Sequence, residues 1–397
     1  LAMTEPSPPD AGRFASVDWN EYDADEGVPA VPRWLPLGAV AVVVGFCYDY
    51  ASAEGLPITM DGLDWLLTFG LYTFGSIGLA AVVGAPKQIA YYWGQFRESR
   101  VAVACLGFLT AFVTVGLLGP LFVTEPEVNV LYSSQPPVWG TIDAMYVPSC
   151  AGEVVDGRCH GSWKYPLGTT AIGGKDLIAL LVLATRTSLS VALGAATIVV
   201  PAGVGVGIAA VRFGGRVESG LMWLAEQLQS FPAVLIYFVL FYWLVEGRLL
   251  ILIGALGLVG WGGLARLVRD ELRVRQNEQY AQAAQLGGVG DRRLLGRHLL
   301  PNVLPSVLSN VALQVPLFIL VEATISFVQI PVSTGSTTLG DPSNFSWGQL
   351  IYGSLFTTGL PAAWWLAGIP LFLLAATVFA FNVVGDSMVE ALEPRGG

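Results

Sequence analysis

The sequence predicts an all-α protein, a polytopic bundle of helices that crosses a membrane several times. Hydrophobic residues make up 54% of the 397-residue chain and charged residues 13%, about half the charged share of a typical soluble domain. The apolar residues also form blocks longer than a soluble core helix requires. Together these observations indicate a multi-pass membrane protein.

The N-terminal residues 1–33 differ from the rest of the chain. They are acidic and proline-containing, and they lack the basic segment and apolar run of a signal peptide. We expect a disordered, acidic, cytoplasmic tail. The chain carries a net charge of −10 and few lysines. This halophile-like composition is typical of a salt-adapted organism, but one acidic tail that biases a small number of charges explains it equally well.

A bilayer core of about 30 Å requires roughly 20 apolar residues in a helix. Eight stretches meet this test, and the first is the weakest because it is short and ends near Asp49. They lie at about 34–51, 63–84, 101–123, 187–210, 221–245, 249–268, 304–328 and 363–386.

Basic residues in the connections predict the orientation. They lie between the second and third spans (Lys87, Arg97, Arg100), between the fourth and fifth (Arg212, Arg216) and between the sixth and seventh (Arg269, Arg273, Arg275, Arg292, Arg293, Arg297). Because these connections alternate, they share one side, which the positive-inside rule assigns to the cytoplasm. We therefore expect a plasma-membrane protein with both termini cytoplasmic and with an external loop at 124–175.

Cys150 and Cys159 flank a polar segment of that external loop. A disulfide is the favoured interpretation for an external pair, and two free thiols are the alternative. Cys47 and Cys105 lie in apolar runs and are expected to be inert.

The fourth span is rich in Gly and Ala, and Pro201 and Pro232 interrupt the fourth and fifth spans. Small residues allow close helix packing in lipid, and a proline is tolerated there where neighbours satisfy the freed carbonyls. We expect both spans to lie inside the bundle.

The segment 269–303 separates two apolar runs and is polar. It is interpreted as a helix over 269–285, a glycine turn at Gly287–Gly288, and a short helix that Asp291 caps and that stops before Pro301. Connectors are commonly short, so a simple linker is the weaker alternative. Ala283 and Ala284 leave a patch of small side chains on which a partner protein can sit closely.

This segment resembles the EAA coupling motif of ABC-importer permeases, in which Glu-Ala-Ala is followed at fixed spacings by Gly, Ile and Leu-Pro. Matching positions are Gln282, Ala283, Ala284, Gly288, Leu300 and Pro301. Gln282 replaces the glutamate, and His298 occupies the isoleucine position, as is usual in the peptide/nickel branch. The resemblance implies contact with an ATPase through these residues, together with Tyr280 and Asp291.

Other segments resemble the same branch. They are Tyr165–Leu177, Phe213–Gly215, Ser346–Gly348 and Phe381–Pro394. The resemblance covers about residues 100–397, a six-span permease domain at 101–397, and leaves two additional N-terminal helices and a cytoplasmic linker at 34–100.

The resemblance implies the second permease of a dipeptide or oligopeptide importer. Its expected partners are a homologous permease, two ABC ATPases, an external solute-binding protein and membrane lipid, with no nucleic acid. ATP and Mg²⁺ are expected on the ATPases and no cofactor on this chain, which is a transport subunit rather than an enzyme. The segment Gly168–Asp176 is nearly a P-loop, but the displaced Lys175 and the absence of Ser/Thr after it argue against nucleotide binding.

Three polar residues in the spans are candidates for the translocation path or gate. Glu322 is costly inside a bilayer, and a tie between helices is favoured over a path-lining role. Glu226 and Gln229 are gate residues or interfacial anchors with equal weight. The spans hold no histidine and no clustered carboxylates that would form a metal site.

The sequence also bears on two other classes of protein. An intramembrane enzyme is disfavoured because no HExxH, GxSxG or paired-carboxylate set is present in the spans. A membrane scaffold with two auxiliary helices remains a second alternative. Within the importer class, nickel or another small solute is the alternative to peptides.

Overall fold

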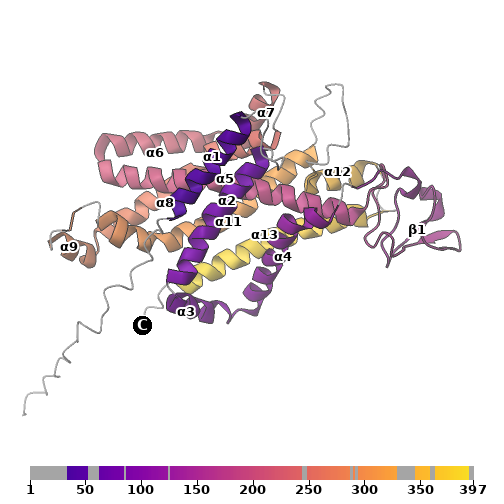
Figure 1. Ribbon diagram of the computed structural model, residues 1–397, viewed down its shortest axis with the longest axis horizontal. Helices are drawn as coiled ribbons and strands as arrows, with labels where there is room; N and C mark the ends of the chain where they lie inside the picture. The colour runs from indigo at the N-terminus through magenta and orange to yellow at the C-terminus, as the bar shows by residue number, and fades with distance from the viewer. Residues whose placement is uncertain are drawn as a thin grey trace, which may run out of the picture.

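The computed structural model describes residues 34–51, 62–84, 86–123, 126–243, 248–286, 289–290, 294–328, 345–357 and 363–392. It is a helical bundle with a small β-sheet domain at one end (Figure 1). The fold class predicted from the sequence is confirmed. The acidic tail predicted at 1–33 lies outside the described residues.

The helices of the bundle are α1 (Trp34–Ala51), α2 (Gly62–Gly84), α3 (Pro86–Phe96), α4 (Arg100–Phe122), α5 (Leu177–Phe213), α6 (Gly215–Ser230), α7 (Ala233–Trp243), α8 (Arg248–Gln276), α9 (Gln279–Leu286), the π-helix η3 (Leu294–Leu299), α11 (Leu300–Val328), α12 (Trp347–Thr357) and α13 (Trp365–Leu392). Six of them are long and apolar enough to cross a membrane, and the bent pair α6–α7 makes a seventh if it is one span. Of α1, the apolar part Leu37–Ala51 is shorter than a full span.

The centre of the bundle is the contact between α5 and α8, which run parallel. Along α5, the successive glycines Gly194, Gly203 and Gly207 face Ile253, Leu264 and Val268 of α8. A Cβ atom at Gly207 would lie 2.8 Å from the Ala265 carbonyl oxygen. Small residues thus bring the two backbones together where no hydrophobic force acts between lipid-embedded helices.

The fourth predicted span, 187–210, was too short. The helix α5 has 37 residues and begins at Leu177. Its first residues are apolar, and Asp176 caps it by accepting a hydrogen bond from the Ile178 N–H at 3.0 Å. Burial raises the pKa of the Asp176 carboxyl, and the Ile178 hydrogen bond partly offsets the rise. Arg186 therefore lies within α5 rather than before it.

The fifth predicted span, 221–245, is broken rather than continuous. α6 ends at Ser230, and α7 leaves it at 76°. Pro232 lies at the bend; it has no N–H to donate and disfavours helical geometry at Phe231 before it. α6 packs antiparallel to α8, where a Cβ atom at Gly262 would lie 2.7 Å from the Ala225 carbonyl oxygen.

The remaining helices alternate in direction. α4 runs antiparallel to α5, since Gly116 meets Leu189 and Gly119 meets Val182. α11 is antiparallel to α8 and α13 to α11, as the contacts Ser306–Glu271 and Gly385–Ala312 show. The three basic connections consequently lie at one end of the bundle, here called the hairpin end (the end with α9), and the sheet domain lies at the other, the sheet end (Figure 1). That the hairpin end is cytoplasmic stays a prediction.

The additional N-terminal helices α1 and α2 form an antiparallel pair docked on α5. Trp65 donates a hydrogen bond from Nε1 to Asp49 Oδ2 at 2.9 Å, which joins α1 to α2. Asp64 of α2 forms an ion pair with Arg186 of α5. Further along the same contact, a Cβ atom at Gly70 would lie 2.8 Å from Thr197 Oγ1. The pair of helices is thus fixed by charge at its start and by close packing along its length.

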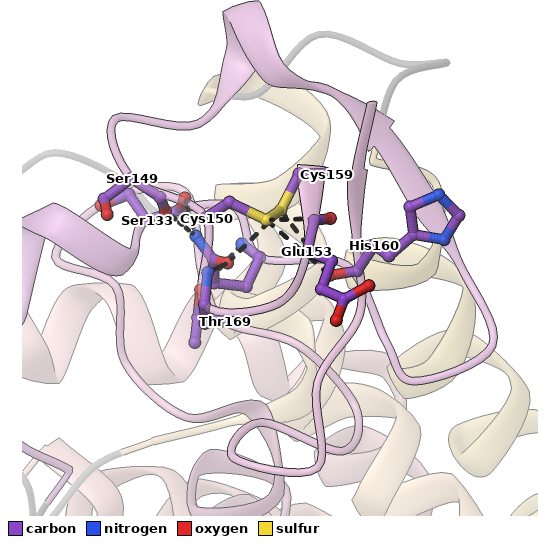
Figure 2. Close-up of a disulfide and its surroundings, with 9 residues drawn as sticks. Ser133, Ser149, Cys150, Glu153, Cys159, His160 and Thr169 are labelled. Carbon is purple, nitrogen blue, oxygen red and sulfur yellow. Dashed lines mark hydrogen bonds between the residues drawn. A yellow bond between two sulfur atoms is a disulfide. The ribbon is translucent and has the colours of Figure 1, made fainter. Parts of the chain in front are cut away.

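The sheet domain (126–176) contains the three-stranded antiparallel sheet β1–β3–β2, formed by β1 (Thr141–Asp143), β3 (Arg158–His160) and β2 (Val154–Val155), with 3₁₀ turns η1 (Val130–Tyr132) and η2 (Ala144–Tyr146). A disulfide joins Cys150 and Cys159, the pairing that the sequence favours (Figure 2). Buried Gln135 lies beside it, donating to the Ser149 carbonyl at 2.7 Å and accepting from the Ala151 N–H at 2.8 Å. This domain was not predicted beyond an external loop.

The near-P-loop segment forms the turn that leads from the sheet domain into α5. Gly168 has φ +88° and packs against the Gln135 carbonyl, and Gly174 has φ +59° and packs against the Asn129 carbonyl. Lys175 Nζ lies 4.9 Å from the centre of the Phe345 ring. The glycines are therefore required by backbone geometry and close approach.

The α5–α8 contact can be tested with two glycines of α5. Gly207→Val should lower the stability of the folded protein by about 1–3 kcal/mol, because the new side chain would overpack against α8. Gly205→Val is the matched control, since no atom lies within 4 Å of the position of its Cβ. The measurement is the thermal midpoint in detergent. Equal midpoints for the two variants would contradict the close packing described here.

Candidate functional site

The candidate site is the 269–303 segment at the hairpin end. Its first part is not a separate helix, because α8 continues from the membrane to Gln276. The chain turns at Asn277–Glu278, and α9 follows from Gln279 to Leu286. The expected helix over 269–285 is therefore divided in two, and any movement of α9 acts directly on the end of a spanning helix.

The return half of the segment also differs from the sequence interpretation. The short helix was expected to stop before Pro301, but η3 runs without a break into α11 at Leu300. Pro301 is the second residue of α11, and because it has no N–H it donates no hydrogen bond back into η3.

A compact apolar core holds the segment against the bundle. Leu272, Ala281, Leu294 and Leu299 are at most 1% exposed. They come from α8, α9 and η3, and they pack with Val303 and Val307 of α11 in one hydrophobic cluster. The segment is thus a folded unit attached to α8 and α11 rather than a loose connection.

The outer face of α9 is exposed. Gln282 and Ala283 are exposed, and the Leu286 side chain at the end of the helix is 90% exposed. Gln282 donates a hydrogen bond from Nε2 to the Asn277 carbonyl oxygen at 3.2 Å. Here the residue that replaces the motif glutamate tightens the turn between α8 and α9, while Ala283 leaves space beside it.

Gly288 and Asp291 lie outside the described residues, and of Tyr280, Ala284, His298 and Pro301 the structure describes the backbone alone. Leu300 is half-buried at the first position of α11. Their assignment to ATPase coupling stays a prediction.

A cluster of charged residues borders the segment, and sequence reasoning missed it. Glu218 of α6 is buried and forms ion pairs with Arg269 and Arg273 of α8. Two residues further along the chain, Arg275 Nη1 lies 3.2 Å from Glu278 Oε1 and Arg275 Nε lies 3.8 Å from Glu271 Oε2. One feature of the sequence could have pointed to this cluster. Glu218 follows the Phe213–Gly215 turn closely and lies in the first turn of α6, at the hairpin end where the arginines gather.

The second polar site lies toward the sheet end, where Glu322 of α11 is completely buried in the chain. Ser188 of α5 donates to its Oε2 at 2.9 Å, and Ser326 donates to its Oε1 at 3.1 Å. The Ser346 hydroxyl, just before α12, also hydrogen-bonds the carboxylate. The carboxylate thus joins three parts of the bundle, and its hydroxyl partners were not predicted.

The segment Ser346–Gly348 explains how α12 reaches this carboxylate. Trp347 is 1% exposed, and its ring lies edge-on to Phe112 of α4 with 5.8 Å between the centroids. Gly348 lies against the carbonyl oxygen of Ala323 in α11, where a side chain would clash with backbone. This contact brings Ser346 within reach of Glu322.

The two other gate candidates have different environments. Gln229 accepts a hydrogen bond from Arg266 of α8 and lies against Gly263. Glu226 is exposed, with Ser230 bonded to its main-chain carbonyl at 2.9 Å. The two residues lie one turn apart on α6, but only Gln229 is bonded to α8. Among the described residues, no group of three or more His, Cys, Asp or Glu is arranged to hold a metal ion.

The chain is thus a bundle of apolar, membrane-spanning helices with a packed, polar helical hairpin at one end. Two family models match this chain. Residues 200–396 match "Binding-protein-dependent transport system inner membrane component". Residues 87–137 match "N-terminal TM domain of oligopeptide transport permease C". Neither model reaches α1 or α2.

Characterised relatives agree with these matches. The oligopeptide transport system permease protein OppC of Haemophilus influenzae is 32% identical over 301 residues, 76% of this chain and 86% of the relative. The dipeptide permease DppC of Bacillus subtilis is 28% identical over 303 residues, 76% and 84% of the two chains. The nickel permease NikC of Escherichia coli is 30% identical over 232 residues, 58% and 78%.

The chain therefore belongs to the permease family of binding-protein-dependent ABC importers, in the branch that contains peptide and nickel permeases. It is a multi-pass membrane protein. The α-helical core that the family resemblance implied is confirmed, and the α1–α2 pair precedes the residues that the family models match.

The packing of Gly348 in α12 against α11, next to Glu322, can be tested by substitution. Gly348→Ala should lower the thermal midpoint strongly, because the new Cβ meets the backbone of α11 and Ser346 would be displaced from the carboxylate. A loss of about 1–3 kcal/mol is the usual cost of such overpacking. Gly353→Ala is the control, since it lies in the same helix and no atom lies within 4 Å of the position its Cβ would occupy. A Gly348→Ala protein as stable as this control would show that α12 is not seated as described.

Proposed function

We propose that this chain is one of two permease subunits of an ATP-driven importer of dipeptides or oligopeptides, and that ATPase subunits drive it through the 269–303 segment. Membership of the family establishes that the chain is a permease of a binding-protein-dependent ABC importer. The observation that carries the finer proposal is the geometry of that segment, a folded helical hairpin whose two ends continue directly into the spanning helices α8 and α11.

The mechanism follows from this continuity. An ATPase that contacts α9 would meet Ala283, where a small side chain allows close approach, and the exposed Leu286. ATP-driven closure of two ATPases would push α9, and α8 and α11 would move as rigid bodies with it. Alternating access by such rigid-body motion turns the cavity between two permeases from one side of the membrane to the other.

The remaining polar residues receive roles within this proposal. Glu322 ties α5, α11 and the start of α12 together, because each of its oxygens accepts from a hydroxyl and no water-facing surface is left in the chain. Gln229 anchors α6 to α8. Glu226, which is exposed, is the better of the two candidates for facing the path.

The proposed assembly contains a homologous second permease, two ATPases that hold ATP and Mg²⁺, and a solute-binding protein. The hairpin end faces the cytoplasm, and the sheet domain meets the solute-binding protein outside. An external position suits a domain that carries a disulfide. Both termini lie on the cytoplasmic side, and the chain itself performs no chemistry.

Peptides are favoured as the solute because relatives named for oligopeptides and dipeptides match 76% of the chain, whereas the nickel permease matches 58%. Nickel or another small solute is the second candidate. A membrane scaffold that does not transport is the third.

The experiment is reconstitution of the chain with its second permease, ATPases and solute-binding protein in lipid vesicles. We expect ATP-dependent uptake of radiolabelled trialanine, and no uptake with a non-hydrolysable ATP analogue. Uptake of Ni²⁺ without peptide would favour the nickel alternative. A stable complex that moves neither solute would contradict the peptide and nickel assignments.

The coupling role is tested at α9. Ala283→Arg should weaken binding of the ATPases by about 30-fold, the effect of losing about 2 kcal/mol at the centre of an interface. Ala283→Ser keeps the small volume and should retain binding. Both are measured by co-purification of ATPase with the permease and by uptake. Normal ATPase binding and uptake in the Ala283→Arg complex would remove α9 from the proposed interface.

A further inference from the structure

Glu218 is the residue that joins the 269–303 segment to the bent pair α6–α7. It lies in the first turn of α6, and its side chain is 7% exposed. Its Oε1 lies 2.8 Å from Nε of Arg269, and its Oε2 pairs with Nη2 of Arg273. Both carboxylate oxygens are therefore held by one helix, α8.

The two arginines lie at the end of α8 that leads into α9. Arg269 and Arg273 are one turn apart, so they lie on one face of α8, in its last two turns before the chain enters α9. From Arg273 the contacts continue into α9. Asn277 donates from Nδ2 to the Arg273 carbonyl oxygen at 3.1 Å, and Gln282 donates to the Asn277 carbonyl oxygen at 3.2 Å. An unbroken chain of polar contacts thus leads from α9 to Glu218.

The far end of α6 is also held to α8. Arg266 donates to Gln229, and Gly262 and Gly263 allow α6 to lie against the α8 backbone. Immediately after this contact the chain bends by 76° into α7. α6 has 16 residues, so it is a rod of about 24 Å clamped to α8 at both ends.

A buried carboxylate with two arginines differs from an ordinary surface ion pair. Surface pairs contribute little and exchange freely with water. Here the carboxylate is buried while Arg269 and Arg273 are 28% and 53% exposed, so without the arginines the Glu218 carboxylate would lie desolvated and uncompensated, which is destabilising. The α6–α8 contact is therefore suited to transmit a displacement rather than to slip.

We propose that Glu218 is a positioning residue for transport: through Arg269 and Arg273 it makes α6 follow the end of α8, so that movement of α9 reaches the α6–α7 bend. This inference rests on the proposed function, because it requires ATPases that act on α9. It predicts that loss of the Glu218 carboxylate uncouples ATP hydrolysis from solute movement while the complex still assembles.

The test compares Glu218→Gln, Glu218→Asp and the wild type in the complete importer in vesicles. Ser219→Ala is the control, since Ser219 is exposed and bonds the Gly215 carbonyl of its own helix at 3.1 Å. Three quantities are measured: ATPase co-purified per permease, ATP hydrolysed, and radiolabelled trialanine taken up. The ratio of the last two quantities, uptake per ATP hydrolysed, separates an effect on coupling from an effect on stability.

We expect Glu218→Gln to retain bound ATPase but to lower uptake per ATP by about tenfold, within the range of coupling between distant sites. Glu218→Asp should recover part of the ratio, and Ser219→Ala should match the wild type. An unchanged ratio in Glu218→Gln would overturn the inference. Wild-type complexes that hydrolyse ATP without uptake would instead overturn the proposed function.

Arg273→Gln provides a second measurement in case Glu218→Gln does not assemble. It removes the more exposed partner, whose side chain is 53% exposed, and leaves Arg269 on Glu218. We expect an intermediate fall in uptake per ATP with normal assembly. A ratio equal to the wild type would show that the cluster holds the fold but does not transmit movement.

Discussion

The structure depends on the close parallel contact between α5 and α8. Gly194, Gly203 and Gly207 allow it, and the other helices are arranged around it. α5 begins directly at the sheet domain, and α8 ends directly at the 269–303 segment. Because interiors packed this closely transmit strain rather than absorb it, a push at one end of α8 is carried along the contact that leads toward the other end of the molecule.

Two buried carboxylates mark the two ends of this arrangement and are compensated differently. Glu322 accepts from neutral hydroxyls of Ser188 and Ser326, which suits a junction of helices embedded in lipid, where a charge is costly. Glu218 is held by arginines at the hairpin end, where basic side chains can reach water. This difference agrees with a fixed junction of helices at Glu322 and with a contact at Glu218 that transmits movement during the proposed transport.

Much of this architecture could be predicted from the sequence. Apolar length located six of the eight predicted spans as helices long enough to cross a membrane, alternation placed the basic connections at one end, and the Gly/Ala-rich run identified α5 as an interior helix. Boundaries were less accurate: the fourth span was predicted from 187, but α5 begins at Leu177 and includes Arg186, whose ion-pair partner Asp64 lies far away in the chain. Likewise, Pro232 signalled an interruption but not a bend of 76°. Glu218 and Ser188 were missed because their partners lie more than 50 residues away in the sequence; Ser326 and Ser346 lie closer to Glu322, but nothing in the sequence marks them as its partners.

The central claim is that α9 is the surface on which an ATPase acts. Cysteine cross-linking tests it most directly, with Ala283→Cys in the assembled importer and a short bifunctional thiol reagent. The account predicts a cross-link to an ATPase subunit whose yield changes when ATP is bound. Val154→Cys on the exposed β2 strand should give none. A transport-competent complex in which residue 283 never links to the ATPase would contradict the account.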